Sequence, residues 1–175
     1  MPYLRNIIAR MTQSTHSLDE YDLRILAALQ EDGSLTNQEL SEKVGLSPSP
    51  CSRRVQKLQE AGVIVGRRTV LSAQKLGLSL TVILQIAMDR HTPERFQNFE
   101  AQIRDAPEVQ ECLLITGQEA DYLLKVVVPD IDSYQEFLLN RVTRIEGVSG
   151  ARSSFVMRRV VETSRLPLDY VARSE

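Results

Sequence analysis

Residues that form metal sites or covalent cross-links are scarce in this sequence. The chain of 175 residues has two cysteines, Cys51 and Cys112, and two histidines, His16 and His91. Both cysteines lie among alternating apolar residues, which favours a reducing cytoplasm over a disulfide framework. Neither histidine has a cysteine, a carboxylate or a second histidine at ligand spacing. We therefore expect no metal site and no cofactor.

An excess of charge of one sign and long apolar runs are also lacking. The formal net charge is −2, which excludes binding to nucleic acid through bulk positive charge and leaves only local asymmetry. Positive charge is concentrated between Lys43 and Arg68, where Glu60 is the one acidic residue. The apolar run within residues 1–17 is too short for a secretory signal. We expect a tail there, in a cytoplasmic protein that has no membrane partner.

The residue combinations that carry catalysis are absent too. We find no nucleophile paired with a base, no glycine loop that would cradle a phosphate and no metal constellation. Ser47, Ser49 and Ser52 have no nearby histidine and are better explained as helix caps and phosphate contacts. The sequence therefore argues against an enzyme.

Residues 35–62 predict two short helices joined by a tight turn. Thr36 and Glu39 have the spacing of a capping box, which starts the first helix. Gly45 permits the left-handed conformation that ends it. Ser47 is expected to cap the second helix, with Pro48 at its first position. From this pattern we infer a helix-turn-helix that lies on DNA.

The outer face predicted for the second helix carries hydrogen-bonding groups and cations but almost no acid. Cys51, Val55 and Leu58 share the buried stripe. The opposite face suits DNA, because arginine and glutamine pair with base edges while serine and lysine hold phosphates. The alternative is an ordinary solvated face on a helical hairpin. The residues predicted to contact double-stranded DNA are Ser47, Ser49, Ser52, Arg53, Arg54, Gln56 and Lys57.

A further helix and a connecting segment complete the N-terminal domain, which we expect to span residues 18–71. Apolar residues recur on one face of a helix over residues 18–32, and this helix would supply the third wall of the core. Residues 63–71 are rich in β-branched side chains and predict a short wing or a connecting strand. Residues 72–79 lack periodicity and predict a linker.

Residues 80–163 predict an α+β domain in the order β-α-β-β-α-β, the ferredoxin-like arrangement with helices on one face of a sheet. Strands are expected at 80–88, 109–116, 122–128 and 148–159, and helices at 93–106 and 131–145. Both faces of the second strand carry apolar residues, and an uncovered apolar sheet is usually an interface. We therefore expect a homodimer. Residues 164–175 are expected to form a C-terminal tail.

Together these pieces resemble the Lrp/AsnC family, the feast/famine transcription regulators. The resemblance rests on LDEYDLRILAALQEDG (18–33), TNQELSEKVGLSPSPCSRRVQKLQEAGVIVG (36–66), ECLLITGQEADYLLKVVVPD (111–130) and RIEGVSGARSSFVM (144–157). It implies a winged helix-turn-helix with its DNA-contacting motif over Asn37–Gln56, which adds Asn37 to the predicted contacts. It also implies a C-terminal RAM/ACT-like module that dimerises and binds a small effector, usually an amino acid. Such dimers would assemble into tetramers or octamers.

The same resemblance implies an effector site between subunits, near the turn after the second strand and against the last strand. The corresponding residues are Thr116, Gly117, Gln118, Glu119, Ala120, Asp121 and Tyr122, with Ser153, Ser154 and Phe155 as lining candidates. Backbone N–H groups of the turn can bind a carboxylate while Asp121 pairs with an ammonium, or Asp121 instead fixes the turn. The competing hypothesis for the whole chain is a metabolic sensor or assembly module that acts on a protein partner without binding DNA.

Overall fold

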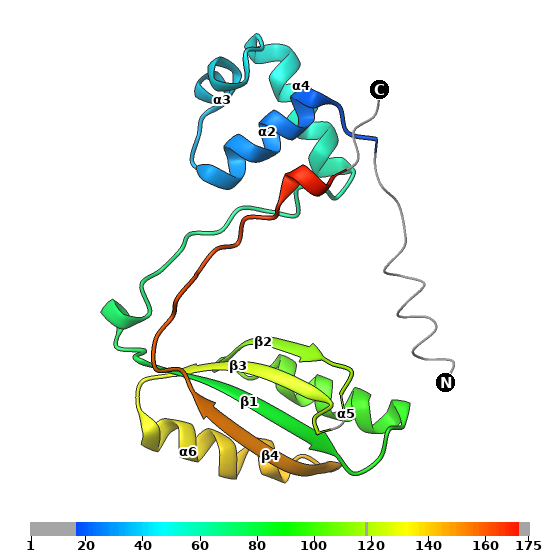
Figure 1. Cartoon of the computed structure of the whole chain (residues 1–175), viewed down its shortest axis with the longest axis vertical. Helices are drawn as coiled ribbons and strands as arrows, with labels where there is room; N and C mark the ends of the chain where they lie inside the picture. The colour runs from blue at the N-terminus through cyan, green and yellow to red at the C-terminus, as the bar shows by residue number, and fades with distance from the viewer. Residues whose placement is uncertain (1–16, 118, 172–175) are drawn as a thin grey trace. The chain divides into compact units, whose positions relative to one another are not determined.

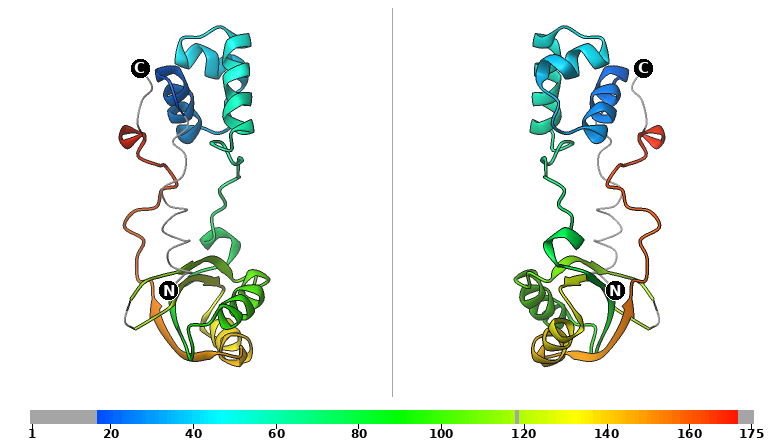
Figure 2. Two further views of the ribbon diagram at one scale, coloured as in Figure 1. Left: turned by 90° about the vertical axis from the view of Figure 1, so that its right-hand side faces the viewer. Right: turned by 90° about the vertical axis from the view of Figure 1, so that its left-hand side faces the viewer.

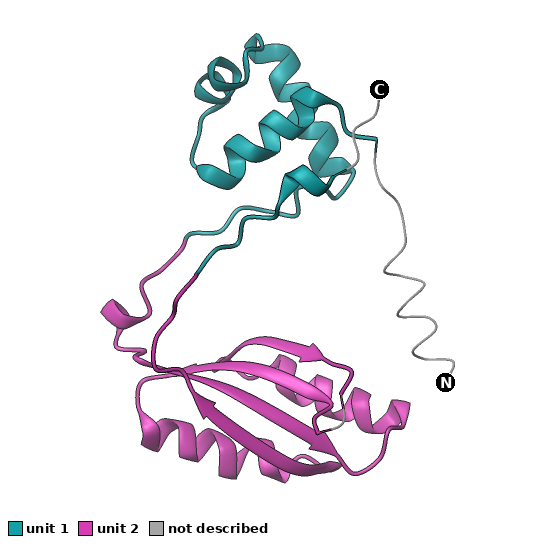
Figure 3. Cartoon of the chain, in the orientation of Figure 1, with its two compact units in different colours: residues 1–69, 162–175 teal, residues 70–161 magenta. Residues whose placement is uncertain are grey.

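The computed structural model describes residues 17–117 and 119–171 (Figure 1). The chain divides into two compact units, residues 1–69 with 162–175 and residues 70–161 (Figure 3). The tail predicted over residues 1–17 lies outside the described residues except for Ser17, and so does Gln118 of the predicted effector site. Among the described residues, none of the helices combines the length and the apolar character needed to cross a membrane.

Three α-helices, α2 (Glu20–Glu31), α3 (Asn37–Val44) and α4 (Pro48–Glu60), form the described core of the first unit. The predicted capping box of α3 is confirmed, because the Thr36 hydroxyl accepts from the Glu39 N–H and the Glu39 carboxylate accepts from the Thr36 N–H. Gly45 ends α3 with a φ of 75°, as predicted. The helix-turn-helix is therefore started and stopped by signals that are local in the sequence.

Ser47 precedes α4, but its hydroxyl makes no capping hydrogen bond, which corrects the predicted cap. The side chain at this position normally accepts from the N–H of the second or third helical residue. The third residue here is Pro50, which has no N–H to donate. Pro48, whose ring presets the helical φ, stands at the start of α4 instead.

The end of the chain packs onto the core of the first unit. Leu168 and Val171 lie against the buried side chains of α2, α3 and α4. The side-chain amide of Gln30 donates to the backbone oxygen of Leu166 at 3.2 Å, and the Leu166 N–H donates to the Gln30 amide oxygen at 2.6 Å. A short helix, η3 (Leu168–Tyr170), follows this pair. A segment that we predicted as a tail therefore contributes packing and hydrogen bonds.

Residues 63–71, for which we predicted a short wing or a connecting strand, form no strand. Val63 and Ile64 both donate their N–H groups to the Leu58 oxygen and pack against the core, so the chain first turns back on α4. Beyond them, residues 65–72 have no strand assignment in the described chain. The predicted linker then contains a short helix, η1 (Gln74–Leu76).

The second unit is an antiparallel sheet with helices on one face, as predicted for a ferredoxin-like domain (Figure 2). The strands are β1 (Leu80–Met88), β2 (Val109–Leu114), β3 (Tyr122–Val128) and β4 (Val148–Phe155), and their order in the sheet is β2-β3-β1-β4. The covering helices are α5 (Pro93–Arg104) and α6 (Ile131–Asn140), the latter followed by η2 (Val142–Arg144). The predicted ends of β2, β4, α5 and α6 were too late in the chain.

Alternation along the central strands separates the two faces of the sheet. Val82, Leu84, Ile86 and Met88 of β1 are buried in the core beneath the helices, where Phe99 and Phe137 pack. The alternate residues of β1 and β3 point to the face without helices. That face brings Ile83 of β1, Leu123 of β3 and Leu113 of β2 to one side of the sheet.

Candidate nucleic-acid interface and effector-binding turn

One face of α4 is exposed to solvent and carries most of the predicted DNA contacts. Helical spacing of about 100° per residue gathers these side chains on one side, while Cys51 and Leu58 of the same helix are buried on the other. No acidic residue occupies the first turn of α4, and the Gln56 amide donates to Glu60 at 2.8 Å near its end. The exposed members of the predicted set are Ser47, Ser49, Ser52, Arg53, Gln56 and Lys57.

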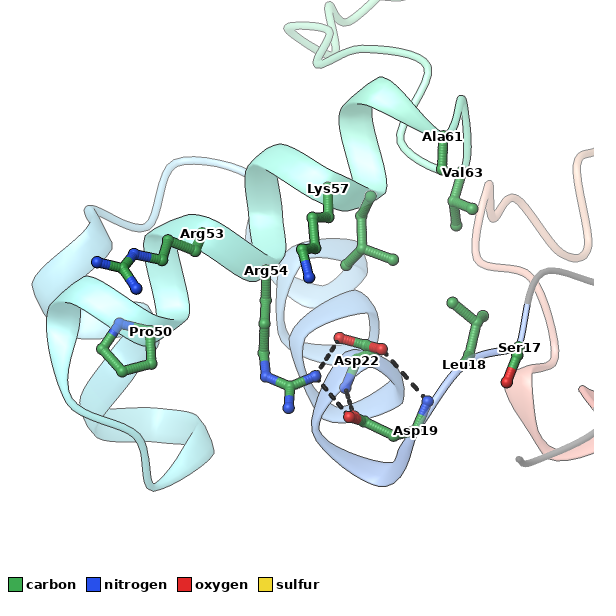
Figure 4. A pocket seen from close by; sticks show the side chains of 11 residues that line it. Ser17, Leu18, Asp19, Asp22, Pro50, Arg53, Arg54, Lys57, Ala61 and Val63 are labelled. Carbon is green, nitrogen blue, oxygen red and sulfur yellow. Dashed lines mark hydrogen bonds and ion pairs between the residues drawn. The ribbon is translucent and has the colours of Figure 1, made fainter. Parts of the chain in front are cut away.

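Arg54 differs from the other cations of α4 because it is held within the protein. Its Nη1 donates to Asp19 Oδ2 at 2.6 Å and to Asp22 Oδ1 at 2.8 Å, and its guanidinium carbon lies 5.6 Å from the centre of the Tyr21 ring. Figure 4 shows Arg54 reaching these carboxylates, whereas Arg53 is directed away from them. Hydrogen bonds from Arg54 to Asp22 and Asp19 raise the pKa of the guanidinium.

Asn37 also has a partner within the chain. Its side-chain amide donates to the backbone oxygen of Pro48 at 2.9 Å, which joins the start of α3 to the start of α4. Asn37 therefore connects α3 to α4, and Arg54 connects α4 to the start of α2. The helical pattern placed Arg54 among the predicted DNA contacts and the family resemblance added Asn37, whereas the partners of both residues lie at distant positions in the sequence.

A groove of about 500 Å³ lies between the start of α2 and α4 (Figure 4). Its walls include the carboxylates of Asp19 and Asp22 and the side chains of Arg53, Arg54 and Lys57. Of the three cations, Arg54 alone has a carboxylate partner that the structure identifies. The rim formed by Arg53 and Lys57 is therefore positively charged.

Asp121, in the turn between β2 and β3, is tied to the body of the sheet. Its Oδ2 accepts from the Met88 N–H at 2.7 Å, and its Oδ1 lies 2.8 Å from His91 Nε2. Its own N–H donates to Ile86, and its backbone oxygen accepts from Ile115, each at 2.8 Å. These contacts support the alternative in which Asp121 fixes the turn. The contact of His91 with Asp121 was not predicted, because His91 was weighed only as a metal ligand.

The other residues of the turn fall into two groups. Thr116, Gly117 and Glu119 are exposed, whereas Ala120 and Tyr122 are buried. Glu119 forms an ion pair of 2.5 Å with Arg152 of β4, which joins the turn to the last strand. Arg152 was not predicted, although it stands directly before the three candidates on β4.

Tyr122, Ser153 and Phe155 all face the helix-covered side of the sheet, because each pairs with a buried residue of β1. The hydroxyl of Tyr122 donates to Glu100 of α5 at 2.8 Å, so this side chain lies beneath the helices. Ser153 is hydrogen-bonded to the hydroxyl of Tyr134 on α6, and Phe155 makes an edge contact with the Tyr134 ring. Ser154, between them, faces the opposite side of β4. Tyr134, a buried residue of α6, was not among the predicted site residues although it contacts two of them.

Catalytic and metal-binding groups are not assembled in the described part of the chain. Residues 17–117 and 119–171 contain no cluster of three potential metal ligands. Both cysteines are free. Burial raises the pKa of Cys51, and burial together with Glu100 raises the pKa of Cys112 to about 11. Both thiols are therefore protonated at neutral pH, which is unfavourable for nucleophilic chemistry.

A helix-turn-helix with an exposed reading helix, joined to a separate sheet domain, defines a DNA-binding transcriptional regulator. Two family models match the chain in that order. Residues 18–65 match a winged helix-turn-helix DNA-binding domain, and residues 81–166 match the Lrp/AsnC ligand binding domain.

Curated relatives and solved structures agree with this classification. The leucine-responsive regulatory protein of Salmonella typhimurium is 42% identical over 149 residues, 85% of this chain and 90% of that protein. The Bkd operon transcriptional regulator of Pseudomonas aeruginosa is 42% identical over 151 residues, 86% of this chain and 98% of that protein. A transcriptional regulator of Neisseria meningitidis, solved in complex with L-Met, superposes with a TM-score of 0.85 at 38% identity, covering 89% of this chain and 100% of that one.

The chain belongs to the Lrp/AsnC family of transcriptional regulators. It is a DNA-binding regulator with a winged helix-turn-helix domain followed by a ligand-binding domain. Its relatives are named as regulators of transcription, which is a non-enzymatic function.

Proposed function

We propose that this regulator is a homodimer that binds double-stranded DNA through the exposed faces of two α4 helices and responds to an amino acid. The single observation that carries the DNA-binding half is the composition of that face. It presents an arginine, a glutamine, a lysine and serines to solvent and has no acid in its first turn. A groove-reading helix requires such groups, because base edges and phosphates accept hydrogen bonds from them.

Within this face, we assign base reading to Arg53 and Gln56 and phosphate binding to Ser49, Ser52 and Lys57. The Ser47 hydroxyl, which caps no helix, is placed to donate to a phosphate as well. A symmetric dimer then requires a roughly palindromic operator with half-sites about one helical turn apart, or a multiple of it. Higher assembly to tetramers or octamers is the expectation from the family.

Replacing Arg53 tests the DNA-binding half. We expect Arg53→Ala to weaken binding to a duplex selected by the wild-type protein by about 1–3 kcal/mol if the guanidinium reads a guanine. Arg104→Ala, which removes an exposed cation from α5, is the matched control and should leave affinity unchanged. Fluorescence anisotropy over a range of salt concentrations measures both. Equal affinities for the two variants would remove Arg53 from the reading face.

The same titration separates this function from the competing one. Binding to duplex should weaken steeply with rising salt, with a slope of about −0.9 per neutralised phosphate. A module that acts only on a protein partner should have no affinity for duplex.

The face of the sheet without helices supports the dimer. Ile83, Leu113 and Leu123 lie on this face, and Leu113 is 43% exposed in the single chain. We expect Leu123→Glu to abolish dimerisation, because it would place a charge in the centre of the buried interface. Leu139→Glu, at an exposed position of α6, should remain dimeric. Sedimentation velocity distinguishes the two, and an unchanged dimer in Leu123→Glu would reject this face.

An amino acid is the effector class that the comparisons support. A structural relative of high similarity was solved with L-Met, and this chain matches the ligand-binding domain of the family. We place the ligand at the turn between β2 and β3 and against β4, where Glu119 and Arg152 already join these elements. The exposed residues Thr116 and Gly117 then contact the carboxylate through backbone N–H groups.

A thermal-shift screen against the twenty amino acids tests the effector half, because a ligand that binds only the folded state raises the melting temperature. Asp121→Asn sharpens the assignment. Its amide oxygen can still accept from the Met88 N–H, but the charge that would pair with an ammonium is lost. Because the contacts of Asp121 fit a residue that fixes the turn, we expect the variant to keep both its DNA affinity and the shift. Loss of the shift would instead assign Asp121 to the ammonium group of the ligand.

A further inference from the structure

The two carboxylates that hold Arg54 also cap α2. The Asp22 N–H donates to Asp19 Oδ1 at 2.9 Å, and the Asp19 N–H donates to Asp22 Oδ2 at 3.3 Å. The remaining oxygen of each carboxylate, Asp19 Oδ2 and Asp22 Oδ1, accepts from Arg54. All four oxygens therefore have partners, and one side chain of α4 is joined to the first turn of α2 by two charged hydrogen bonds.

This contact is partly shielded from water. The Asp22 side chain is 16% exposed and the Arg54 side chain 31%. Although burial opposes it, the Asp22 N–H and Arg54 lower the pKa of Asp19. The Asp19 side chain is 42% exposed, and a single nitrogen, Arg54 Nη1, donates to both carboxylates. An arginine held by two charged hydrogen bonds has less freedom of orientation than one with a single exposed partner.

The position of Arg54 on α4 determines what the contact restrains. Arg54 follows Arg53 directly, so their side chains leave the helix about 100° apart. If Arg54 is anchored on α2, α4 cannot roll about its axis, and Arg53 and Gln56 keep a fixed direction. The ring of Tyr21, 5.6 Å from the guanidinium carbon, closes one side of the same anchor.

We infer that Arg54 is a positioning residue: it does not neutralise a phosphate but holds the reading face of α4 in register through Asp19 and Asp22. This inference rests on the proposed reading face and deepens it. The positioning role and a direct phosphate contact predict opposite changes in DNA affinity when the carboxylates are removed. If Arg54 bound DNA directly, removing its carboxylate partners would release it and strengthen binding; if it positions α4, removing them weakens binding.

The test uses the full chain and a labelled duplex selected from a random-sequence pool by the wild-type protein. Asp19→Asn removes the charge while keeping a residue that caps helices as well as aspartate does. Glu20→Gln is the matched control, because it removes one negative charge from the same helix end at a side chain that contacts Arg24 instead. We expect Asp19→Asn to bind about tenfold more weakly than Glu20→Gln, the order of one lost base contact.

Arg54→Gln supplies a readout that distinguishes a positioning role from a direct phosphate contact. Its affinity should fall, but the slope of log affinity against log salt should stay that of the wild type. A direct phosphate contact would reduce the slope by about 0.9. Arg54→Lys, which can still reach one carboxylate, should bind between the wild type and Arg54→Gln, and it keeps the test valid if the glutamine variant does not fold.

The outcomes separate this inference from the proposed function. If the wild type itself has no salt-dependent affinity for duplex, the proposed function fails. If the wild type binds but Asp19→Asn is equal to or tighter than Glu20→Gln, or the Arg54→Gln slope falls by about 0.9, the positioning role is overturned.

Discussion

The two units of this chain stabilise themselves in different ways. Among the described residues, the core of the sheet unit contains sixteen buried side chains drawn from one continuous stretch, residues 82–145. The core of the helix-turn-helix unit contains eight, and the distant segment that carries Leu168 and Val171 packs against it. One unit is completed by its own stretch of chain, whereas the other takes packing from the end of the chain.

This difference follows from what each unit presents to its partners. The α4 helix turns its polar face outward and gives only Cys51 and Leu58 to the fully buried core, so the first unit has little apolar surface to bury. Contacts between helices compensate, including Arg54 with the start of α2 and Lys43 with Glu31. The sheet unit buries one face under helices and can leave the other for a second copy.

The largest effect that would sharpen this comparison is expected from Leu168→Ala. Leu168 packs on the core of the first unit, and losing this partly buried side chain should lower the unfolding free energy of that unit by about 1 kcal/mol. The sheet unit should be unaffected. Amide hydrogen exchange, read separately for α2–α4 and for β1–β4, measures both.

Tyr170→Ala is the control for that experiment, because Tyr170 lies in the same short helix but is 90% exposed. It should leave exchange in both units unchanged. If Leu168→Ala also leaves hydrogen exchange in α2–α4 unchanged, the segment that carries Leu168 lies on the first unit without stabilising it. The two units would then differ only in the size of their cores.

The features that could be predicted from the sequence are those encoded by near neighbours. Thr36 and Glu39 are three residues apart and Gly45 needs only its own backbone, so their roles follow from residue type and spacing. The burial of alternate side chains along β1 also follows from the local sequence, because successive side chains of a strand point to opposite faces. These local signals were sufficient for the fold class and for the exposed face of α4.

Contacts between distant residues could not be predicted in this way. Arg54 is 35 residues from Asp19, Arg152 is 33 from Glu119, and Leu166 is 136 from Gln30. Periodicity predicts which face of a helix or strand is polar, but it does not predict which side chain of another element contacts that face. For that reason Arg54 was grouped with the DNA contacts, and residues 164–175 were predicted to form a tail.

The smallest expected effect is a difference between the two units in how their stability changes when the pH is lowered. In the first unit the pKa values of Asp19, Glu31 and Glu39 are lowered. Burial opposes the lowering of the Asp19 pKa, but the Asp22 N–H and Arg54 outweigh it. A hydrogen bond from Lys43 lowers the pKa of Glu31. The Thr36 N–H lowers the pKa of Glu39. A carboxyl whose pKa is lower in the folded state stabilises that state above its ordinary pKa of about 4 and loses this contribution as pH falls.

In the sheet unit the described carboxyls with lowered pKa are Glu94 and Asp130, both at helix starts. We therefore expect amide protection to fall earlier in α2–α4 than in β1–β4 when the pH is lowered below about 4. Glu39→Gln should reduce the acid sensitivity of α3, because glutamine also serves in a capping box and does not titrate. If the sheet lost amide protection first, its larger apolar core would not protect that unit from acid. The difference in core size would then not determine which unit unfolds first.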